Sequence, residues 1–168
     1  MTLAELNRFD RAQFVAALGG IYEHSPWIPE LAWQQRPFAT VESLHAAMAD
    51  VVARAGLKRQ LALIRAHPEL AGKAMIRHAL TADSTAEQSG AGLTLCSPAE
   101  FARLHDLNAR YSAKFGFPFI LAVKGYDRSG VIAEFARRVD NDRDTELAEC
   151  LRQIDKIARL RLDALLTN

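Results

Sequence analysis

Cysteine is scarce in this sequence, which contains Cys96 and Cys150 and no others. The two lie far apart, and no CxxC spacing occurs. The pattern therefore indicates neither a zinc site nor a dithiol redox motif, and reduced thiols of an intracellular protein are the simplest interpretation.

An excess of charge of one sign is also lacking. The chain has 21 Lys and Arg against 20 Asp and Glu, and the basic residues are scattered along it. Proteins that bind nucleic acid or an anionic membrane surface usually concentrate basic residues on one face or segment. We therefore expect no nucleic-acid partner and no membrane-surface role.

Long hydrophobic runs are missing as well. The first residues, MTLAELNRFDRAQF, carry acidic and polar side chains where a secretory signal needs an apolar stretch. No later run reaches the length of a membrane span, and the final LLTN is not a targeting tripeptide. We expect a cytoplasmic protein without membrane association.

The usual motifs for nucleotides and metals do not occur. Neither a GxGxxG loop nor a P-loop is present, and His24, His45, His78 and His105 show no HExxH or comparable ligand spacing. We expect no nucleotide cofactor and no metal site.

Helical patterns dominate what is present. The chain of 168 residues is 49% hydrophobic, which suffices to bury a substantial core. Asp10, Thr40 and Ser97 each have the surroundings of a helix N-cap. The helices predicted from caps and periodicity begin at these three residues or cover about 26–33, 57–66, 68–80, 129–139 and 143–166.

The segment FPFILAV, residues 117–123, is the one candidate strand. No partner strand is visible elsewhere, so we predict a buried extended or turn segment instead. The predicted fold class is all-α: a single-domain multi-helix bundle over residues 1–168, with short connecting turns and no sheet.

His67 interrupts this helical pattern. The ring of Pro68 disfavours α conformation at the residue before it, which places the histidine at a helix junction. An imidazole suits acid–base chemistry near neutral pH, and the end of a preceding helix favours its cationic form. The alternative is a hydrogen-bonded spacer without chemistry.

The polar segment DSTAEQSGAG, residues 83–92, also has two interpretations. Ser84 and Glu87 read as a capping box and Gly90 as a helix stop, so one exposed helical turn would explain it. Alternatively, a hydroxyl, a carboxylate, an amide and backbone N–H groups at a helix start can surround a small, nitrogen-rich ligand.

Arg161 stands on the apolar side of the last predicted helix, seven residues after Ile154 and four before Leu165. Such an arginine either extends its guanidinium to water or forms a buried fork for a substrate carboxylate. Asn108, on the inward stripe of the helix after Ser97, is a weaker signal of the same kind.

Three motifs occur together in one order: HPEL at 67–70, STAEQSGAGL from Ser84, and the run from Asn108 through Tyr111 to KFGFPFI at 114–120. With the RLRLDALL helix near the end, they resemble the OHCU decarboxylase family over essentially the whole chain. OHCU is 2-oxo-4-hydroxy-4-carboxy-5-ureidoimidazoline, an intermediate of urate catabolism. No single motif would suffice for this resemblance.

The resemblance implies a cofactor-free, all-helical enzyme, usually a homodimer, that converts OHCU to (S)-allantoin and carbon dioxide. It assigns the catalytic acid/base to His67, and we expect Glu87 to share the proton transfers. The guanidinium of Arg161 would engage the charged end of the substrate. The substrate-binding positions that it implies are Pro68, Ser84, Thr85, Ala86, Gln88, Phe119, Ile120, Leu121, Ala122, Val123 and Arg161.

The reaction so implied is consistent with the missing cofactor motifs. Decarboxylation needs an acceptor for an electron pair, and many enzymes take one from a cofactor. In OHCU the carboxylated carbon adjoins a ring C=N bond that can accept the pair. The protein must then position the substrate, bind the neighbouring hydroxyl and deliver a proton. We expect His67 to face that hydroxyl, and Glu87 to orient the histidine or the ureido nitrogens.

Two rival interpretations stay open at this point. One is a non-catalytic helical domain that binds a ureide or purine, and the other is a decarboxylase of the same fold for a related heterocyclic acid. A binding domain would tolerate loss of His67 and would release no carbon dioxide.

Overall fold

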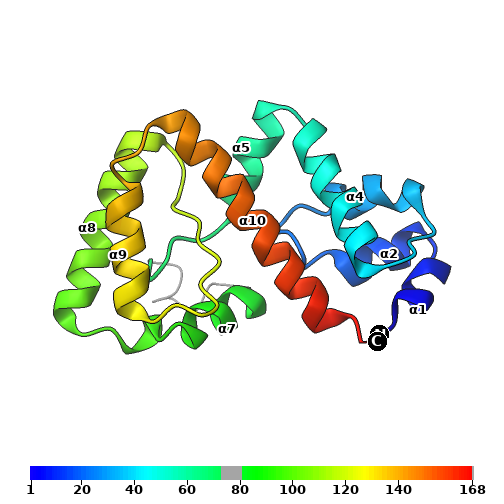
Figure 1. Ribbon diagram of the computed structural model, residues 1–168, viewed down its shortest axis with the longest axis horizontal. Helices are drawn as coiled ribbons and strands as arrows, with labels where there is room; N and C mark the ends of the chain where they lie inside the picture. The colour runs from blue at the N-terminus through cyan, green and yellow to red at the C-terminus, as the bar shows by residue number, and fades with distance from the viewer. Residues whose placement is uncertain (73–80, 168) are drawn as a thin grey trace. The chain divides into compact units, whose positions relative to one another are not determined.

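The computed structural model describes residues 1–72 and 81–167 (Figure 1). Within these residues every regular element is a helix, so the all-α prediction is confirmed. Contacts group the chain into two compact units: unit 1 comprises Met1–Ala66 and Ile154–Asn168, and unit 2 comprises His67–Gln153. A single domain over the whole chain stays a prediction. None of the described helices is long and apolar enough to cross a membrane.

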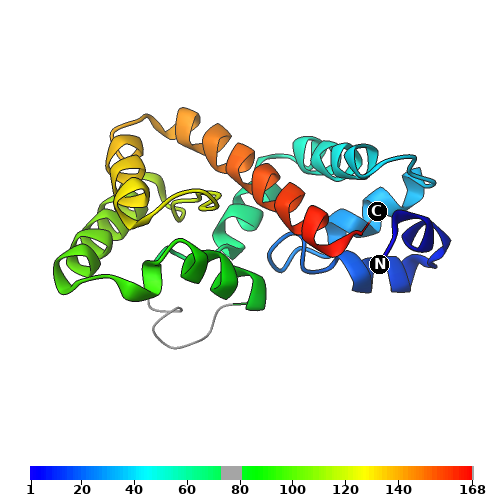
Figure 2. The same ribbon diagram turned by 60° about the horizontal axis from the view of Figure 1, so that its bottom comes forward.

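Unit 1 is formed by the first helices of the chain and the last part of the C-terminal helix. In Figure 2, α3 lies against α4, and both chain ends belong to this unit, where Thr167 N–H donates to Met1 C=O at 2.9 Å. Its elements are α1 (Leu3–Arg8), α2 (Arg11–Leu18), α3 (Trp27–Ala32), the 3₁₀ turn η1 (Trp33–Gln35), α4 (Val41–Arg54), α5 (Leu57–Ala66) and residues 154–165 of α10 (Arg143–Leu165).

Capping boxes explain where several helices of unit 1 begin. Asp10 accepts from the N–H of Gln13, whose side chain accepts from the N–H of Asp10, and Thr40 begins α4 in the same way. Such caps satisfy N–H groups that have no partner inside the helix, each worth about 1 kcal/mol. Helix α1 also begins with a capping box, from Thr2 to Glu5, but it is not among the predicted helices.

Unit 2 has α8 and α9 side by side (Figure 1). Between them Tyr111 contacts four phenylalanine rings, with centroid distances from 4.5 to 6.1 Å. The predicted cap at Ser97 and the helix end at Gly116 are confirmed. Its elements are α7 (Ala82–Gly90), the 3₁₀ turn η2 (Leu93–Leu95), α8 (Pro98–Phe115), α9 (Arg128–Arg138) and residues 143–153 of α10.

The segment 117–123 contains no strand, as predicted. Its side chains are buried except for those of Pro118 and Ala122, which are half-buried. Phe119 stacks on Phe135 of α9 at a centroid distance of 3.9 Å. The apolar run is therefore explained by burial against helices.

The helix predicted from Pro68 to Leu80 is wrong at its start. Residues 68–72 form a turn without helical structure, in which Ala71 adopts a left-handed conformation with φ +50°. Backbone groups that a helix would use are instead bound by amide side chains from α7 and α8. The rest of this prediction, residues 73–80, lies outside the described residues.

The capping box predicted at Ser84 is also wrong. Helix α7 begins one turn earlier, with Thr81 as its N-cap, and the Thr81 hydroxyl accepts from the N–H of Ser84. Thr81 and Ser84 are both competent caps. Beginning at Thr81 makes Ser84 an interior helical residue, four positions before Gln88, and both are buried.

Candidate active site

His67 follows directly after Ala66, the last residue of α5, and precedes Pro68. The prediction of a helix junction is therefore confirmed. Only 7% of the histidine is exposed, so its imidazole is largely removed from water. Burial of this kind is typical of a residue whose position is set by the fold.

The turn after the histidine is fixed by two amide side chains. The Gln88 oxygen accepts from Ala71 N–H at 2.9 Å, and its nitrogen donates to Glu69 C=O at 3.3 Å. From α8, the Asn108 nitrogen donates to Leu70 C=O at 2.9 Å. Helices α7 and α8 thus hold the backbone beside the histidine. Asn108, a weak signal in the sequence, is one of its main supports.

The predicted contact residues on α7 divide between two faces. Ser84 and Gln88 are buried, while Glu87 beside them is half-buried. Thr85 and Ala86 are exposed on the other face. The interpretation of this segment as a single exposed turn is therefore wrong, because α7 is a longer helix with a buried polar face.

The segment 119–123 lies against α9 and α10 in the same unit. Arg138 donates from Nη1 to Ile120 C=O at 2.6 Å, and the Gln153 oxygen accepts from Ala122 N–H at 3.0 Å. Two backbone groups of the predicted substrate-binding segment are thus bound by side chains that the sequence interpretation did not select.

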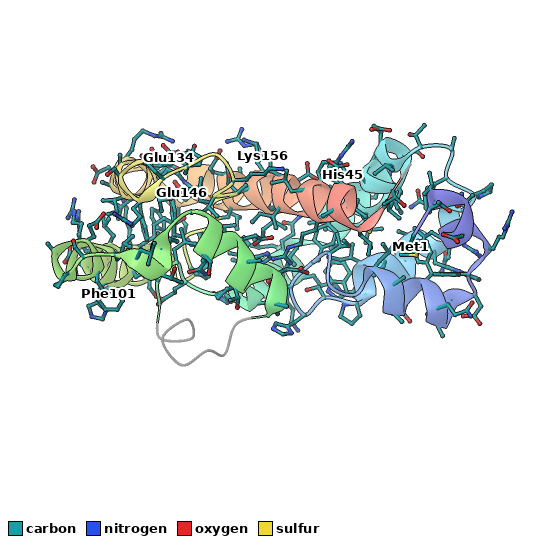
Figure 3. All side chains as sticks on the ribbon, turned by 90° about the horizontal axis from the view of Figure 1, so that it is seen from below. Met1, His45, Phe101, Glu134, Glu146 and Lys156 are labelled. Atoms are coloured by element: carbon teal, nitrogen blue, oxygen red, sulfur yellow. The ribbon has the colours of Figure 1, made fainter. Side chains whose placement is uncertain are left out.

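A buried ionic cluster stands behind this segment. Arg138 and Glu146 form an ion pair at 2.7 Å in which neither side chain is exposed. Tyr111 donates to the same carboxylate at 2.7 Å and Asn141 at 3.1 Å. Glu146, labelled in Figure 3, marks the position of the cluster on α10. The signal that could have found Arg138 is its spacing, seven residues after the buried Val131.

Burial and pairing act in opposite directions on this cluster. Burial disfavours the charged guanidinium of Arg138, but the hydrogen bonds and charge of Glu146 outweigh it and raise the pKa of the arginine. Burial, together with the neighbouring Cys150 and Glu146, raises the pKa of Tyr111. The tyrosine is therefore a neutral hydrogen-bond donor rather than an acid at physiological pH.

Arg161 points inward in unit 1, as its place on the helical stripe predicts. It is 8% exposed, and it pairs with Glu23 at 3.0 Å and donates to Gly20 C=O at 3.0 Å. The alternative, an arginine that extends to water, is wrong. Glu23 is also buried, but it lies outside any helix. Helical periodicity therefore could not predict its ion pair with Arg161.

Unit 2 thus brings together the turn after His67, α7 and α8, and it places the segment 119–123 against α9 and α10. Arg161 belongs to unit 1, with partners from the loop between α2 and α3. Among the residues that the structure describes, no group of three or more His, Cys, Asp or Glu side chains could hold a metal ion.

The sequence profile of the OHCU decarboxylase family matches residues 7–163. The chain belongs to the OHCU decarboxylase family. Proteins named 2-oxo-4-hydroxy-4-carboxy-5-ureidoimidazoline decarboxylase are similar over nearly their whole length: one from Halalkalicoccus jeotgali is 39% identical over 98% of this chain and 92% of its own. Another, from Mus musculus, is 41% identical over 99% of this chain and 93% of its own.

Solved structures agree with this OHCU decarboxylase fold. A crystal structure of (S)-allantoin synthase superimposes with a TM-score of 0.80 at 30% identity and covers 99% of this chain, which spans 54% of that protein's length. An OHCU decarboxylase structure determined in the presence of (S)-allantoin has a TM-score of 0.71 over 95% of this chain and all of its own. At 20% identity it supports the fold alone.

Proposed function

We propose that this member of the family converts OHCU to (S)-allantoin and carbon dioxide without a cofactor. The observation that carries the proposal is the family's HPEL motif, in which a buried His67 is followed by a turn that Gln88 and Asn108 fix from two helices. Catalytic groups need this kind of preorganised support to act on a bound substrate.

The chemistry follows from the substrate. The bond between the ring carbon and its carboxylate breaks as carbon dioxide leaves, and its electron pair forms a C=C bond to the neighbouring ring carbon. The π pair of the C=N bond moves onto the ring nitrogen, which takes up a proton from solvent. The enol-like intermediate then loses the hydroxyl proton and gains a proton on the carbon that bears the ureido group. A side chain that can both accept and donate a proton serves this sequence, and in this proposal the imidazole of His67 takes that role.

The remaining site residues receive supporting roles in this proposal. Glu87 orients the histidine or the ureido nitrogens, and Arg161 anchors the substrate's negative charge. The other contacts come from Pro68, from Ser84 to Gln88 on α7, and from the backbone of residues 119–123. We also propose that residues 1–168 act as one cytoplasmic domain that assembles as a homodimer.

To test the proposal, OHCU is generated in situ from urate, and the optical activity of the allantoin that forms is followed. The wild-type chain should give (S)-allantoin faster than the spontaneous reaction. Racemic product at the spontaneous rate would refute the decarboxylase proposal. Retained binding of (S)-allantoin in that case would favour a ureide-binding domain, and turnover of a different heterocyclic acid would favour a related decarboxylase.

The role of His67 is tested by His67→Asn, which should lower kcat/KM by about 10²- to 10⁴-fold while the chain stays folded. His105→Asn on the exposed side of α8 is the matched control and should retain activity. Wild-type turnover by His67→Asn at neutral pH would refute the assignment.

A further inference from the structure

Side chains of α9 and α10 contact backbone groups along one edge of the segment 118–123. The segment runs without helix, turn or bend. In an extended backbone the N–H and C=O of one residue face one edge, and those of the next residue face the other. Side chains of α9 and α10 contact the backbone of Pro118, Ile120 and Ala122, which are alternate residues, so we place these three on one edge that faces the two helices.

Every side-chain contact to the backbone of this segment among the described residues falls on this edge, while Val123 C=O at the end of the segment accepts from Tyr126 N–H at 3.0 Å. Arg138 binds Ile120 C=O and Gln153 binds Ala122 N–H, as described above. The Cys150 sulfur lies 3.9 Å from Pro118 C=O. Burial raises the pKa of this thiol, and a hydrogen bond from Ile120 N–H acts in the opposite direction. Three side chains from two helices thus satisfy one edge of the segment.

The other edge differs. The alternation assigns the N–H and C=O of Leu121 to the opposite edge. Neither group has a hydrogen-bond partner among the described residues. A buried backbone donor and acceptor usually have partners, so this pair calls for one. An adjacent donor and acceptor match the N–H and C=O of a cyclic amide or ureide.

The side chains behind the segment are themselves fixed. The carboxylate of Glu149 can only accept, and Gln153 donates its amide N–H to it at 2.7 Å, which turns the Gln153 oxygen toward Ala122. The Glu146 carboxylate fixes Arg138 through Nε and Nη2, which leaves Nη1 directed at Ile120. Neither the Gln153 amide nor the Arg138 guanidinium can rotate away from the segment without also breaking its hydrogen bonds to a glutamate.

We propose that Gln153 and Arg138 are positioning residues for the reaction: they hold residues 120–122 from behind so that Leu121 presents its N–H and C=O to the substrate. This inference rests on the proposed function, which makes residues 119–123 part of the substrate site. It adds two residues that do not touch the substrate but set the place of groups that do.

The test compares two variants on the same helix. Gln153→Met keeps the side-chain length and removes the acceptor for Ala122 N–H. Arg152→Met is the matched control, because Arg152 also donates to Glu149 but is exposed and does not contact the segment. Gln153→Met should raise KM for OHCU about five- to tenfold with kcat nearly unchanged, whereas Arg152→Met should stay within about twofold of wild type.

Arg138→Lys provides a second measurement. A lysine keeps the charge opposite Glu146 but cannot donate to that carboxylate and to Ile120 C=O in one fork geometry. It should raise KM in the same direction as Gln153→Met. If Arg138→Lys does not fold, Gln153→Met decides alone, since its contact lies outside the ionic cluster.

Titration with (S)-allantoin, followed by the ¹⁵N–¹H signal of Leu121, separates this inference from the proposed function. An inactive wild type whose Leu121 signal still shifts, with weaker (S)-allantoin binding in Gln153→Met, would refute the function but support the positioning of Leu121 for ligand binding. An active wild type with unchanged KM in Gln153→Met and no Leu121 shift would overturn the positioning role. An inactive wild type without a shift would overturn both.

Discussion

Among the described residues, unit 1 and unit 2 each contain a buried arginine–glutamate pair, and the two pairs differ in how completely they are enclosed. In unit 2 neither side chain of Arg138 and Glu146 has any exposed surface, and Tyr111 also binds the carboxylate. In unit 1 the side chains of Arg161 and Glu23 are 7% and 2% exposed. The first pair is sealed, whereas the second retains some contact with solvent.

This difference in enclosure indicates different roles for the two arginines. A sealed pair cannot exchange its partner for a ligand, because desolvation of both charges is offset only by the contacts already made. Arg138 therefore suits a constant task, which is to hold Ile120 C=O. An arginine at the margin of the solvent can meet an incoming carboxylate, as the proposed function requires of Arg161.

Glu146→Ala should have the largest effect on stability, because it leaves the Arg138 charge buried without compensation. We expect the free energy of unfolding to fall by about 3–5 kcal/mol. Urea denaturation measures this loss. Glu134→Ala, which breaks the more exposed pair with Arg137, is the control and should cost about 0–1 kcal/mol. A loss under about 1 kcal/mol in Glu146→Ala would show that the pair is not sealed in solution.

Glu23→Ala should have a smaller effect, since Arg161 is slightly less enclosed than Arg138 and keeps its hydrogen bond to Gly20 C=O. We expect a loss of about 1–3 kcal/mol in the free energy of unfolding. The control is Glu30→Ala, which removes an exposed pair with Arg11 in the same unit. A larger loss in Glu23→Ala than in Glu146→Ala would reverse the comparison.

The same comparison shows what the sequence could reveal. The inward stripe of α10 predicts that Arg161 is buried, and the stripe of α9 carries the equivalent signal for Arg138. The sequence does not reveal the partners. Glu23 precedes Arg161 by 138 positions, and only tertiary packing brings the two together.

Helix starts show a similar limit. Where one strong cap stands alone, as at Ser97, the predicted start is confirmed. Where two competent caps lie three residues apart, as Thr81 and Ser84 do, local propensity is nearly equal for both. Burial of Ser84 and Gln88 then decides between them, and burial depends on the rest of unit 2.

The two units also differ in a buried neutral group: the hydroxyl of Tyr111 in unit 2 has a hydrogen-bond partner, whereas that of Tyr22 in unit 1 has none among the described residues. Tyr111→Phe removes the hydroxyl that donates to Glu146 and leaves one lone pair of a buried carboxylate without its donor. We expect the free energy of unfolding to fall by about 1–2 kcal/mol, measured by urea denaturation. Unchanged stability would mean that Arg138 and Asn141 alone satisfy the carboxylate.

Tyr22→Phe in unit 1 should have the smallest effect and the opposite sign. Tyr22 is 2% exposed, and its hydroxyl has no hydrogen-bond partner among the described residues. Burial, together with the charge of Asp155, raises the pKa of this tyrosine, so the hydroxyl is neutral but still desolvated. Its removal should leave the free energy of unfolding unchanged or raise it by up to about 1 kcal/mol. A loss greater than about 0.5 kcal/mol would show that a buried water binds the hydroxyl in solution.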